Sequence, residues 1–294
     1  MSRALRIGPR TTGSDGSAEP GAETAAQAAG PRRTARRFHG LPVPGVRQVL
    51  SVLATLALVQ LLGMTGVLSR SSFPLVSSVL ARLGALLADS SFWTSVGYSL
   101  SQALLGLALG TAVAVPLGIT LGRLPFVDHA LRPIIEFLRP IPSVALLPLV
   151  ILTAGVGLSG AVILTGLSSL WLVLVLSIRG ARAADPLAEE MLISFGVPLM
   201  ARLRRLVLPS ALPFIVTGVR IAASVALVVA ITVELLGGMP GLGKNVQASL
   251  QNADKVGVYA YVIAAGLLGL IVNLLFVPVE DRLLSWHSSR RAVR

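Results

Sequence analysis

The chain contains no cysteine, so it can form no disulfide, no thiolate nucleophile and no cysteine-based metal site. Charge is also scarce, because only 13% of the 294 residues are Asp, Glu, Lys or Arg, against about 25% in soluble domains. Three stretches, 48–69, 90–122 and 140–178, carry no charged residue at all. A helix needs about 20 apolar residues to cross the hydrocarbon core of a bilayer. The composition therefore predicts an all-α, polytopic membrane protein.

The sequence also lacks a Walker A phosphate-binding loop. The nearest approach runs from Gly238 to Gly243-Lys244, but its spacing is one residue short and Asn245 follows the lysine. Any ATP hydrolysis must therefore reside on a separate chain. The three histidines, His39, His129 and His287, lie outside the expected membrane segments, which argues against an intramembrane enzyme. We expect no catalytic residue, no metal and no cofactor.

Six transmembrane helices are predicted. The uncharged run 140–178 is long enough for two crossings, and its middle, 155–160, is a glycine-rich turn between them. The prolines in and near the third segment favour ordinary kinked packing over a broken helix that lines a path. The six expected segments are 48–68, 93–121, 136–155, 160–178, 214–236 and 257–279.

The distribution of Lys and Arg predicts the orientation. With the N-terminal tail placed inside, 21 of the 25 basic residues lie on the inner side, Arg220 being counted with the inner loop, and 4 lie outside. Cytoplasmic loops carry such an excess, so both termini are expected in the cytoplasm. The net charge of +12 flanks membrane segments and does not indicate a nucleic-acid partner. The arginine cluster 32–37 is more consistent with an inside anchor than with an export signal, because the apolar run after it is too long.

The domain organisation follows from these patterns. Residues 1–46 are predicted to be a disordered, basic cytoplasmic tail, since they are rich in Gly, Ala, Ser and Pro without apolar periodicity. Residues 47–92 hold the first transmembrane helix and an external segment. Residues 93–282 form a membrane core with a cytoplasmic loop at 179–213, and residues 283–294 form a C-terminal cytoplasmic tail.

The polar loop between the fourth and fifth segments is the most informative feature. Asp185 and Pro186 are typical of a helix start, and Gly196 can end that helix in the left-handed conformation. A second helix is expected to begin at Pro198 and to stop at Leu208-Pro209. Its apolar stripe would be Leu199, Leu203 and Leu206, with Arg202, Arg204 and Arg205 facing water or headgroups. Physics alone leaves two interpretations open, a lever for a partner protein and an amphipathic loop resting on the bilayer.

Three motifs resemble a known family, the type I permease subunits of ABC importers for sulfonates, taurine, nitrate and related oxyanions. Glu190, Gly196 and Leu206-Val-Leu-Pro209 have the spacing of the cytoplasmic EAA loop, although Met191 and Leu192 replace both alanines. The segment 133–149, with its Pro-Ile-Pro run, matches the family before the third crossing. Glu234 and Gly241-Leu-Gly243 match it after the fifth. The similarity covers about residues 50–286.

The resemblance implies a transport subunit of the bacterial inner membrane and no enzyme activity on this chain. It implies two ABC ATPase subunits, a second permease copy and an extracytoplasmic solute-binding protein as partners. Residues that the resemblance assigns to ATPase coupling are Glu189, Glu190, Phe195, Gly196, Val197, Leu206 and Pro209. Those that it assigns to the path or gate are Glu234, Gly241, Gly243, Pro140 and Pro142.

Few polar groups lie inside the expected segments. Glu234 follows Phe214 by 20 residues, or about 30 Å of helix, which predicts a place at the outer interface. It is either a gate or docking residue or a solvated helix end. No arginine is expected at mid-membrane, so an anion path would have to use hydroxyls, amides and helix N-termini. The candidates by polarity are Ser99, Ser101, Gln102, Thr165, Ser168, Ser169, Ser224, Thr232 and Asn273.

Two further questions stay open at this point. Gly106 and Gly110 form a Gly-x-x-x-Gly pair that would serve contacts within one chain or between two. The alternative function is an ion-coupled secondary carrier, which predicts acidic residues at mid-membrane, and none is seen at that depth. The alternative substrate is another small organic nutrient handled by the same family.

Overall fold

The structure is a computed structural model that describes residues 44–65 and 73–283. The tails expected to be cytoplasmic lie largely outside this range. The chain divides into two compact units, 1–53 and 54–294, and each is considered by itself. Every regular element in the described ranges is a helix, which confirms the all-α fold.

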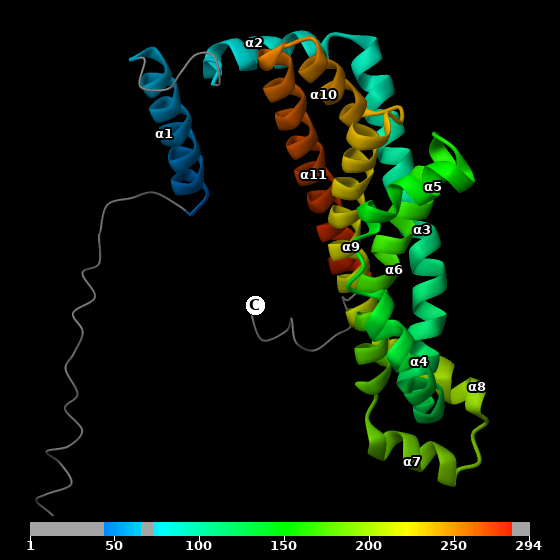
Figure 1. The fold of residues 1–294 in the computed structure, drawn as a ribbon. Coiled ribbons are helices and arrows are strands. Elements are labelled where there is room, and N and C mark those ends of the chain that lie inside the picture. The colour runs from blue at the N-terminus through cyan, green and yellow to red at the C-terminus, as the bar shows by residue number, and fades with distance from the viewer. Residues whose placement is uncertain (1–43, 66–72, 284–294) are drawn as a thin grey trace, which may run out of the picture. The chain divides into compact units, whose positions relative to one another are not determined.

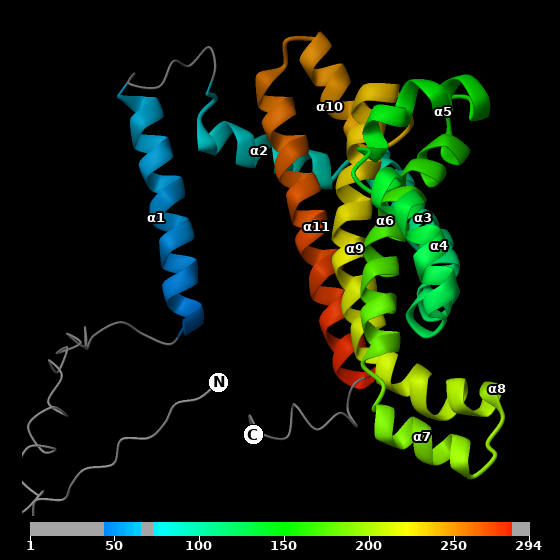
Figure 2. The same cartoon turned by 60° about the horizontal axis from the view of Figure 1, so that its bottom comes forward.

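Four long helices correspond to four expected crossings. They are α3 (Ser90–Arg123), α6 (Leu158–Arg182), α9 (Leu208–Gly237) and α11 (Lys255–Leu283). They run alongside one another in Figures 1 and 2. Their shared core is built from small and branched apolar residues such as Ala114, Val173, Ala226 and Leu227. Close packing of this kind holds transmembrane helices together where water exclusion between helices is absent.

The number of crossings in the described ranges is smaller than the expected six. Four helices are long and apolar enough to cross a membrane, and a fifth span is reached if one bent pair counts as a single crossing. The first expected segment corresponds to α1 (Pro44–Met64), and its end, 66–68, lies outside the described residues. A sixth crossing stays a prediction.

The prediction that residues 136–155 form one kinked helix is wrong. The structure has α4 (Pro125–Leu138), a 3-10 turn at Ser143–Leu146 and α5 (Leu147–Ala154), with a bend of 77° across the break. Pro140 and Pro142 lie in this break. Neither has a backbone N–H for a helical hydrogen bond, and Pro142 is extended at ψ 120°. The predicted turn at 155–160 is present, since α5 ends before Gly155, which has φ +77°, and α6 begins at Leu158.

Glycines on α3 settle the question about the Gly-x-x-x-Gly pair. A Cβ on Gly106 would meet the Thr165 side chain, and one on Gly110 would lie 3.0 Å from the Leu170 amide nitrogen, both on α6. Gly118 and Gly122 face Ser177 and Ala181 of the same helix. The small residues therefore serve contact between two helices of one chain.

Two short helices were not predicted. They are α2 (Val76–Leu87) and α10 (Leu242–Gln251), and both views place them at the same end of the bundle. Buried residues recur three or four apart on each, as on Val79, Leu83 and Leu86 of α2. They pack with Phe92 and Ala264 into a second apolar cluster that covers this end of α3 and α11.

Candidate functional site

The loop at residues 185–207, called the elbow below, projects at the end of the bundle opposite to α10 (Figures 1 and 2). Its first helix is α7 (Pro186–Ser194), and the Asp185 carboxylate accepts a hydrogen bond from the Leu187 amide at 3.0 Å. The helix ends as predicted at Gly196, which has φ +69°. The Gly196 amide donates to Ile193 O and the Val197 amide to Leu192 O, both at 2.9 Å. This pair of bonds is the Schellman arrangement, which fixes where the chain turns back.

The second half of the elbow differs from the prediction. After Pro198, α8 (Leu199–Arg202) passes into one turn of π-helix, Leu203–Val207, and then directly into α9. The expected stop at Leu208-Pro209 is therefore wrong. Pro209 has no amide hydrogen to offer to the preceding turn, and the wider turn before it is bonded from Leu208 N to Leu203 O. The helix continues across the proline, so that the second half of the elbow, from Leu199, forms one continuous helical element with α9.

An ion-pair cluster attaches α7 to the bundle. The Glu189 carboxylate pairs with Arg123 at the end of α3, and its other oxygen lies 3.9 Å from Arg202 on α8. All three side chains are about four-fifths buried, with exposed fractions of 19–20%. The prediction that Arg202 faces water is wrong, because it turns inward to this carboxylate. Paired charges that are mostly withdrawn from water hold a fixed geometry more firmly than surface pairs do.

A second ion pair supports the same end. Arg182, at the end of α6, lies 2.9 Å from Asp128 on α4. Beneath these charges, Ala181, Ala184 and Val207 form a small buried cluster, against which Leu203 and Leu206 pack. Leu206 thus lies on the inner face as expected. The elbow is held by charge on one side and by apolar packing on the other.

The outer face of the elbow is unusually apolar. Phe195 is 79% exposed and Met200 is 74% exposed, although large apolar side chains in a polar loop are normally covered. Leu199 was expected on the packed stripe and is exposed instead. Glu190 is exposed on this face as well, while the adjacent Glu189 points inward. The other exposed apolar side chains of the elbow are Leu187, Met191 and Ile193. Such a surface is typical of a protein-binding site.

The opposite end of α9 carries a buried polar cluster, called the Glu234 latch below. One carboxylate oxygen of Glu234 accepts hydrogen bonds from Ser99 Oγ at 2.8 Å and from the Gly243 amide at 2.9 Å. Ser99 Oγ in turn accepts from the Leu242 amide at 2.9 Å. The side chain of Gln102 donates to Pro240 O at 2.7 Å. The latch therefore joins α3, α9 and the start of α10.

Glycine is required at two positions in this latch. Gly241 has φ +150°, and a Cβ there would overlap the Glu234 carboxyl group. A Cβ on Gly243 would overlap Ile231 O. Glu234, Gly241 and Gly243, which the sequence offered as one motif, thus lie in one contact. Pro140 and Pro142 belong to the break between α4 and α5 instead.

The surroundings of Glu234 correct one of its two interpretations. Its exposed fraction is 0%, so it is not a solvated helix end. The cost of withdrawing a carboxyl group from water is offset here by the Ser99 and Gly243 donors. The second oxygen, Oε1, is buried and has no partner. The path candidates Ser99, Gln102 and Thr165 are also buried, and each is hydrogen-bonded to another part of the protein.

Sequence reasoning missed a third polar cluster, between α9 and α11. Arg220 was counted with the cytoplasmic loop, yet it lies within α9, 12 residues after its first residue. Its guanidinium is 2.7 Å from the Glu280 carboxylate, and its Nε donates to Asn273 Oδ1 at 3.2 Å. Arg220 could have been found by noticing that it lies inside the expected segment 214–236. Glu280, only one residue beyond the last expected segment, gave a weaker signal.

In residues 44–65 and 73–283, no group of three His, Asp or Glu side chains could hold a metal ion. The geometry is that of a membrane helix bundle with an exposed apolar elbow at one end.

Comparison with known proteins agrees with this geometry. Residues 114–285 match the family described as binding-protein-dependent transport system inner membrane component. The chain is 31% identical to an Escherichia coli protein named as an aliphatic sulfonates transport permease, SsuC, over 78% of this chain and 87% of the relative. It is 29% identical to the E. coli taurine transport system permease protein TauC, over 68% and 72% of the two chains.

Other relatives have different names. The formylaminopyrimidine transport permease ThiX of Halalkalibacterium halodurans is 30% identical over 69% of this chain and 82% of its own length. Among solved structures, the inward-facing MetNI methionine ABC transporter matches with a TM-score of 0.59 at 17% identity. The match covers 66% of this chain and 96% of that chain, and at this identity it shows the fold alone.

Proposed function

Because the chain belongs to the family of binding-protein-dependent transport system inner membrane components, we propose that its elbow is the surface through which an ABC ATPase drives it. The protein is the multi-pass permease subunit of an ABC importer in the bacterial inner membrane. ATP is hydrolysed on a separate partner chain, and a solute-binding protein is the other partner of the family.

The single observation that carries the coupling proposal is the exposed apolar face of a rigidly held elbow. Phe195 and Met200 are exposed on segments whose inner faces are fixed by the Glu189 ion pairs and by Leu206. A large apolar side chain that is exposed on a rigid backbone binds a partner's groove with little loss of conformational entropy. We assign Glu190, Phe195, Gly196 and Val197 to the contacting side of the elbow, and Glu189, Leu206 and Pro209 to its support.

The continuous helix from the elbow into α9 explains how a displacement of the elbow reaches the opposite end of the bundle. From Leu199 to Gly237 the chain is helical without a break, and the only irregularity is the π-helical turn at Leu203–Val207. A displacement of α8 is therefore passed along α9, which carries Glu234 near its far end. We propose that the Glu234 latch, with Gly241 and Gly243, is the gate at that end. Opening it requires that buried hydrogen bonds exchange partners.

The proposal includes the orientation, assembly and substrate. The excess of basic residues supports a cytoplasmic location for both termini and the elbow, where ATP is available. Two copies of this chain pair with two ATPase subunits around one path. The substrate is a small organic sulfonate, taurine or a related oxyanion such as nitrate. The names of the relatives SsuC and TauC support the sulfonate and taurine part of this proposal.

The coupling proposal is tested with Gly196→Arg. Gly196 has φ +69° and open space around it, so arginine adds strain of about 1–2 kcal/mol and a bulky charge on the docking face, but no internal clash. We expect normal membrane insertion and at least about a tenfold loss of ATPase co-purification, equivalent to about 1.4 kcal/mol of binding.

The matched control is Gly155→Arg. Gly155 also has positive φ, at +77°, and open space around it, but it lies between α5 and α6. Its conformation, with ψ 177°, is one that essentially only glycine adopts, so the backbone cost is at least that of Gly196→Arg. ATPase association should nevertheless persist, because the elbow is not touched. Unchanged ATP-driven uptake in Gly196→Arg, or uptake driven by a proton gradient without any ATPase, would overturn the proposal.

A further inference from the structure

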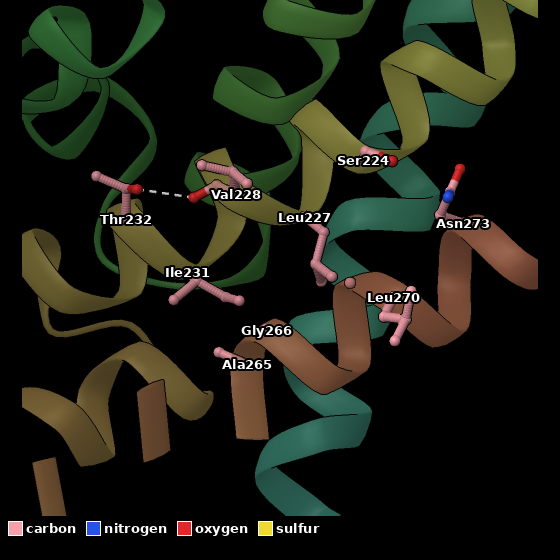
Figure 3. Close-up of a pocket in the computed structure, with 10 residues that line it drawn as sticks. Ser224, Leu227, Val228, Ile231, Thr232, Ala265, Gly266, Leu270 and Asn273 are labelled. Carbon is pink, nitrogen blue, oxygen red and sulfur yellow. Dashed lines mark hydrogen bonds between the residues drawn. The ribbon is translucent and has the colours of Figure 1, made fainter. Parts of the chain in front are cut away.

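A groove runs between α9 and α11, and polar groups gather in it. Its volume is about 580 Å³, and the helices contribute Leu227, Val228 and Ile231 on one side and Ala265, Gly266 and Leu270 on the other. Ser224 and Asn273 lie near one end of it and Thr232 lies near the other (Figure 3). A hydroxyl can face hydrocarbon when it bonds to its own helix, as Thr232 does to Val228 O, but the amide of Asn273 is costly to leave in hydrocarbon and favours a polar occupant at its end of the groove.

The Ser224 end of the groove is bordered by a positive charge. Arg220 precedes Ser224 by one helical turn, and its Nε donates to Asn273 Oδ1, which lies in the groove lining. Its counter-ion, Glu280, follows Asn273 by two turns of α11, or about 10 Å farther from the groove. The Arg220 side chain is 33% exposed and that of Glu280 only 11%. Arg220 is therefore the more exposed member of the ion pair, and its bond to Asn273 brings it to the border of the groove.

We propose that this groove is a binding subsite for a small organic oxyanion, with Arg220, Asn273 and Ser224 at the end that receives the charged group. The inference rests on the proposed function and adds a recognition element to it. A guanidinium with adjacent amide and hydroxyl donors matches the oxygens of a sulfonate or a similar anion. The apolar walls accept the short carbon chain. The pairing with Glu280 keeps the empty site close to neutral, so affinity is low and the substrate is released readily.

The absence of cysteine makes the test direct, because any introduced cysteine is unique. Ser224→Cys in the full chain, reconstituted in lipid nanodiscs that expose both faces, is treated with two thiol reagents. One is the anionic sulfonatoethyl methanethiosulfonate and the other is the cationic trimethylammonium-ethyl analogue. The measured quantity is the ratio of their labelling rates. Leu109→Cys on α3, 58% exposed and outside the groove, reports labelling at an apolar surface.

The charge is then removed in the same background. Arg220→Gln combined with Glu280→Gln leaves neither partner as an unpaired buried charge. We expect the anion-to-cation ratio at Ser224→Cys to fall about fivefold in that variant, because Arg220 contacts the groove lining while Glu280 lies farther away, so that loss of the positive charge outweighs loss of the negative one. Arg220→Lys, which keeps the charge, should retain the preference. Methanesulfonate should slow labelling of Ser224→Cys, while the uncharged dimethyl sulfone of similar size should not.

Three outcomes would overturn the proposal. The ratio would be unchanged in the double variant if Arg220 did not act on the groove. Labelling as slow as that of Leu109→Cys would mean that lipid fills the groove, and a disulfide between two Ser224→Cys chains would mean that a second copy covers it. No ATPase is present in this experiment. A failure here is therefore separate from a failure of the elbow proposal, which Gly196→Arg tests.

Discussion

The two ends of α9 are built on opposite principles. The elbow end is charged and partly open, with Glu189 placed between Arg123 and Arg202 and with Phe195 left uncovered. The latch end is closed and nearly free of charge, with Glu234 fully buried against Ser99 and the Gly243 amide. Both ends contain a glutamate and a glycine with positive φ, so similar residues serve different purposes.

The difference follows from what each end has to do. The elbow ion pairs hold α7 in place, yet each side chain keeps about a fifth of its surface in water, so solvent and the second arginine compensate when one contact lengthens. Buried hydrogen bonds have no such compensation, since each group that loses its partner keeps the full cost of desolvation. An end that is pushed by a partner can use the first kind of contact. An end that has to be either closed or open is better served by the second.

The largest effect is expected at the latch, with Gly241→Ala. Alanine at φ +150° is strained, and its Cβ would overlap the Glu234 carboxyl group. We expect a loss of more than about 3 kcal/mol of stability, or failure to accumulate in the membrane. The loss of stability is measured by unfolding the purified chain in mixed micelles with increasing sodium dodecyl sulfate.

Gly238→Ala is the matched control for this variant. Gly238 also has a positive φ, +68°, but nothing lies within 4 Å of the position that its Cβ would take, so only backbone strain of about 1 kcal/mol is added. If the two variants were equally stable, the space that Gly241 leaves for the Glu234 carboxyl group would not be needed for a closed latch, and the contrast between the two ends would fail.

An intermediate effect is expected at the elbow, with Glu189→Gln. This change leaves Arg123 and Arg202 close together without a carboxylate between them. We expect local destabilisation of about 1–3 kcal/mol, below the range for a fully buried pair. The bundle should stay folded, while hydrogen exchange of the α7 amides should accelerate by about tenfold or more.

Glu190→Gln provides the comparison on the same helix. Glu190 is exposed, so the exchange rates of α7 should not change in the isolated permease. Acceleration spread over α3, α6 and α9 in Glu189→Gln would show that the elbow is not a separate local unit. That result would contradict the view that this end tolerates displacement.

The smallest effect concerns an exposed carboxylate at the start of α3. Asp89 caps that helix, and bonds from the Ser91 amide and hydroxyl lower the pKa of Asp89. Since its pKa is lower in the folded chain than in the unfolded one, the ionised cap stabilises the fold above the unfolded value of about 3.9. That contribution is lost as the pH falls through the folded pKa.

The measurement is a series of thermal melts between neutral pH and about pH 3, spanning the usual Asp range. Asp89→Asn should flatten part of the decline seen below about pH 4. Ser91→Ala, which removes only the hydroxyl bond, should have a smaller effect than Asp89→Asn. An identical decline in the unmodified chain, Asp89→Asn and Ser91→Ala would show that the exposed Asp89 cap contributes nothing to stability, and the prediction would fail.

Several features were predictable because they depend on neighbours in the sequence. The Asp185 cap, the end of α7 at Gly196 and the turn at Gly155 each depend on a few adjacent residues. The prediction failed where a wider context decides. Pro209 was expected to end a helix, but the preceding turn widens to a π-helix and the chain continues. Pro140 and Pro142 were expected to kink a crossing, and they accompany a bend of 77°.

The sequence by itself determined the membrane class, the approximate position of four long helices and the position of the elbow. Hydropathy and local capping depend on composition along the chain, and a single sequence contains that information. Only the tertiary structure decided that Glu189, rather than Glu190, turns inward, that Glu234 is buried, and that Arg220 meets Glu280. Those outcomes depend on which side chains from distant segments arrive at the same place, because burial and pairing are properties of the packed bundle.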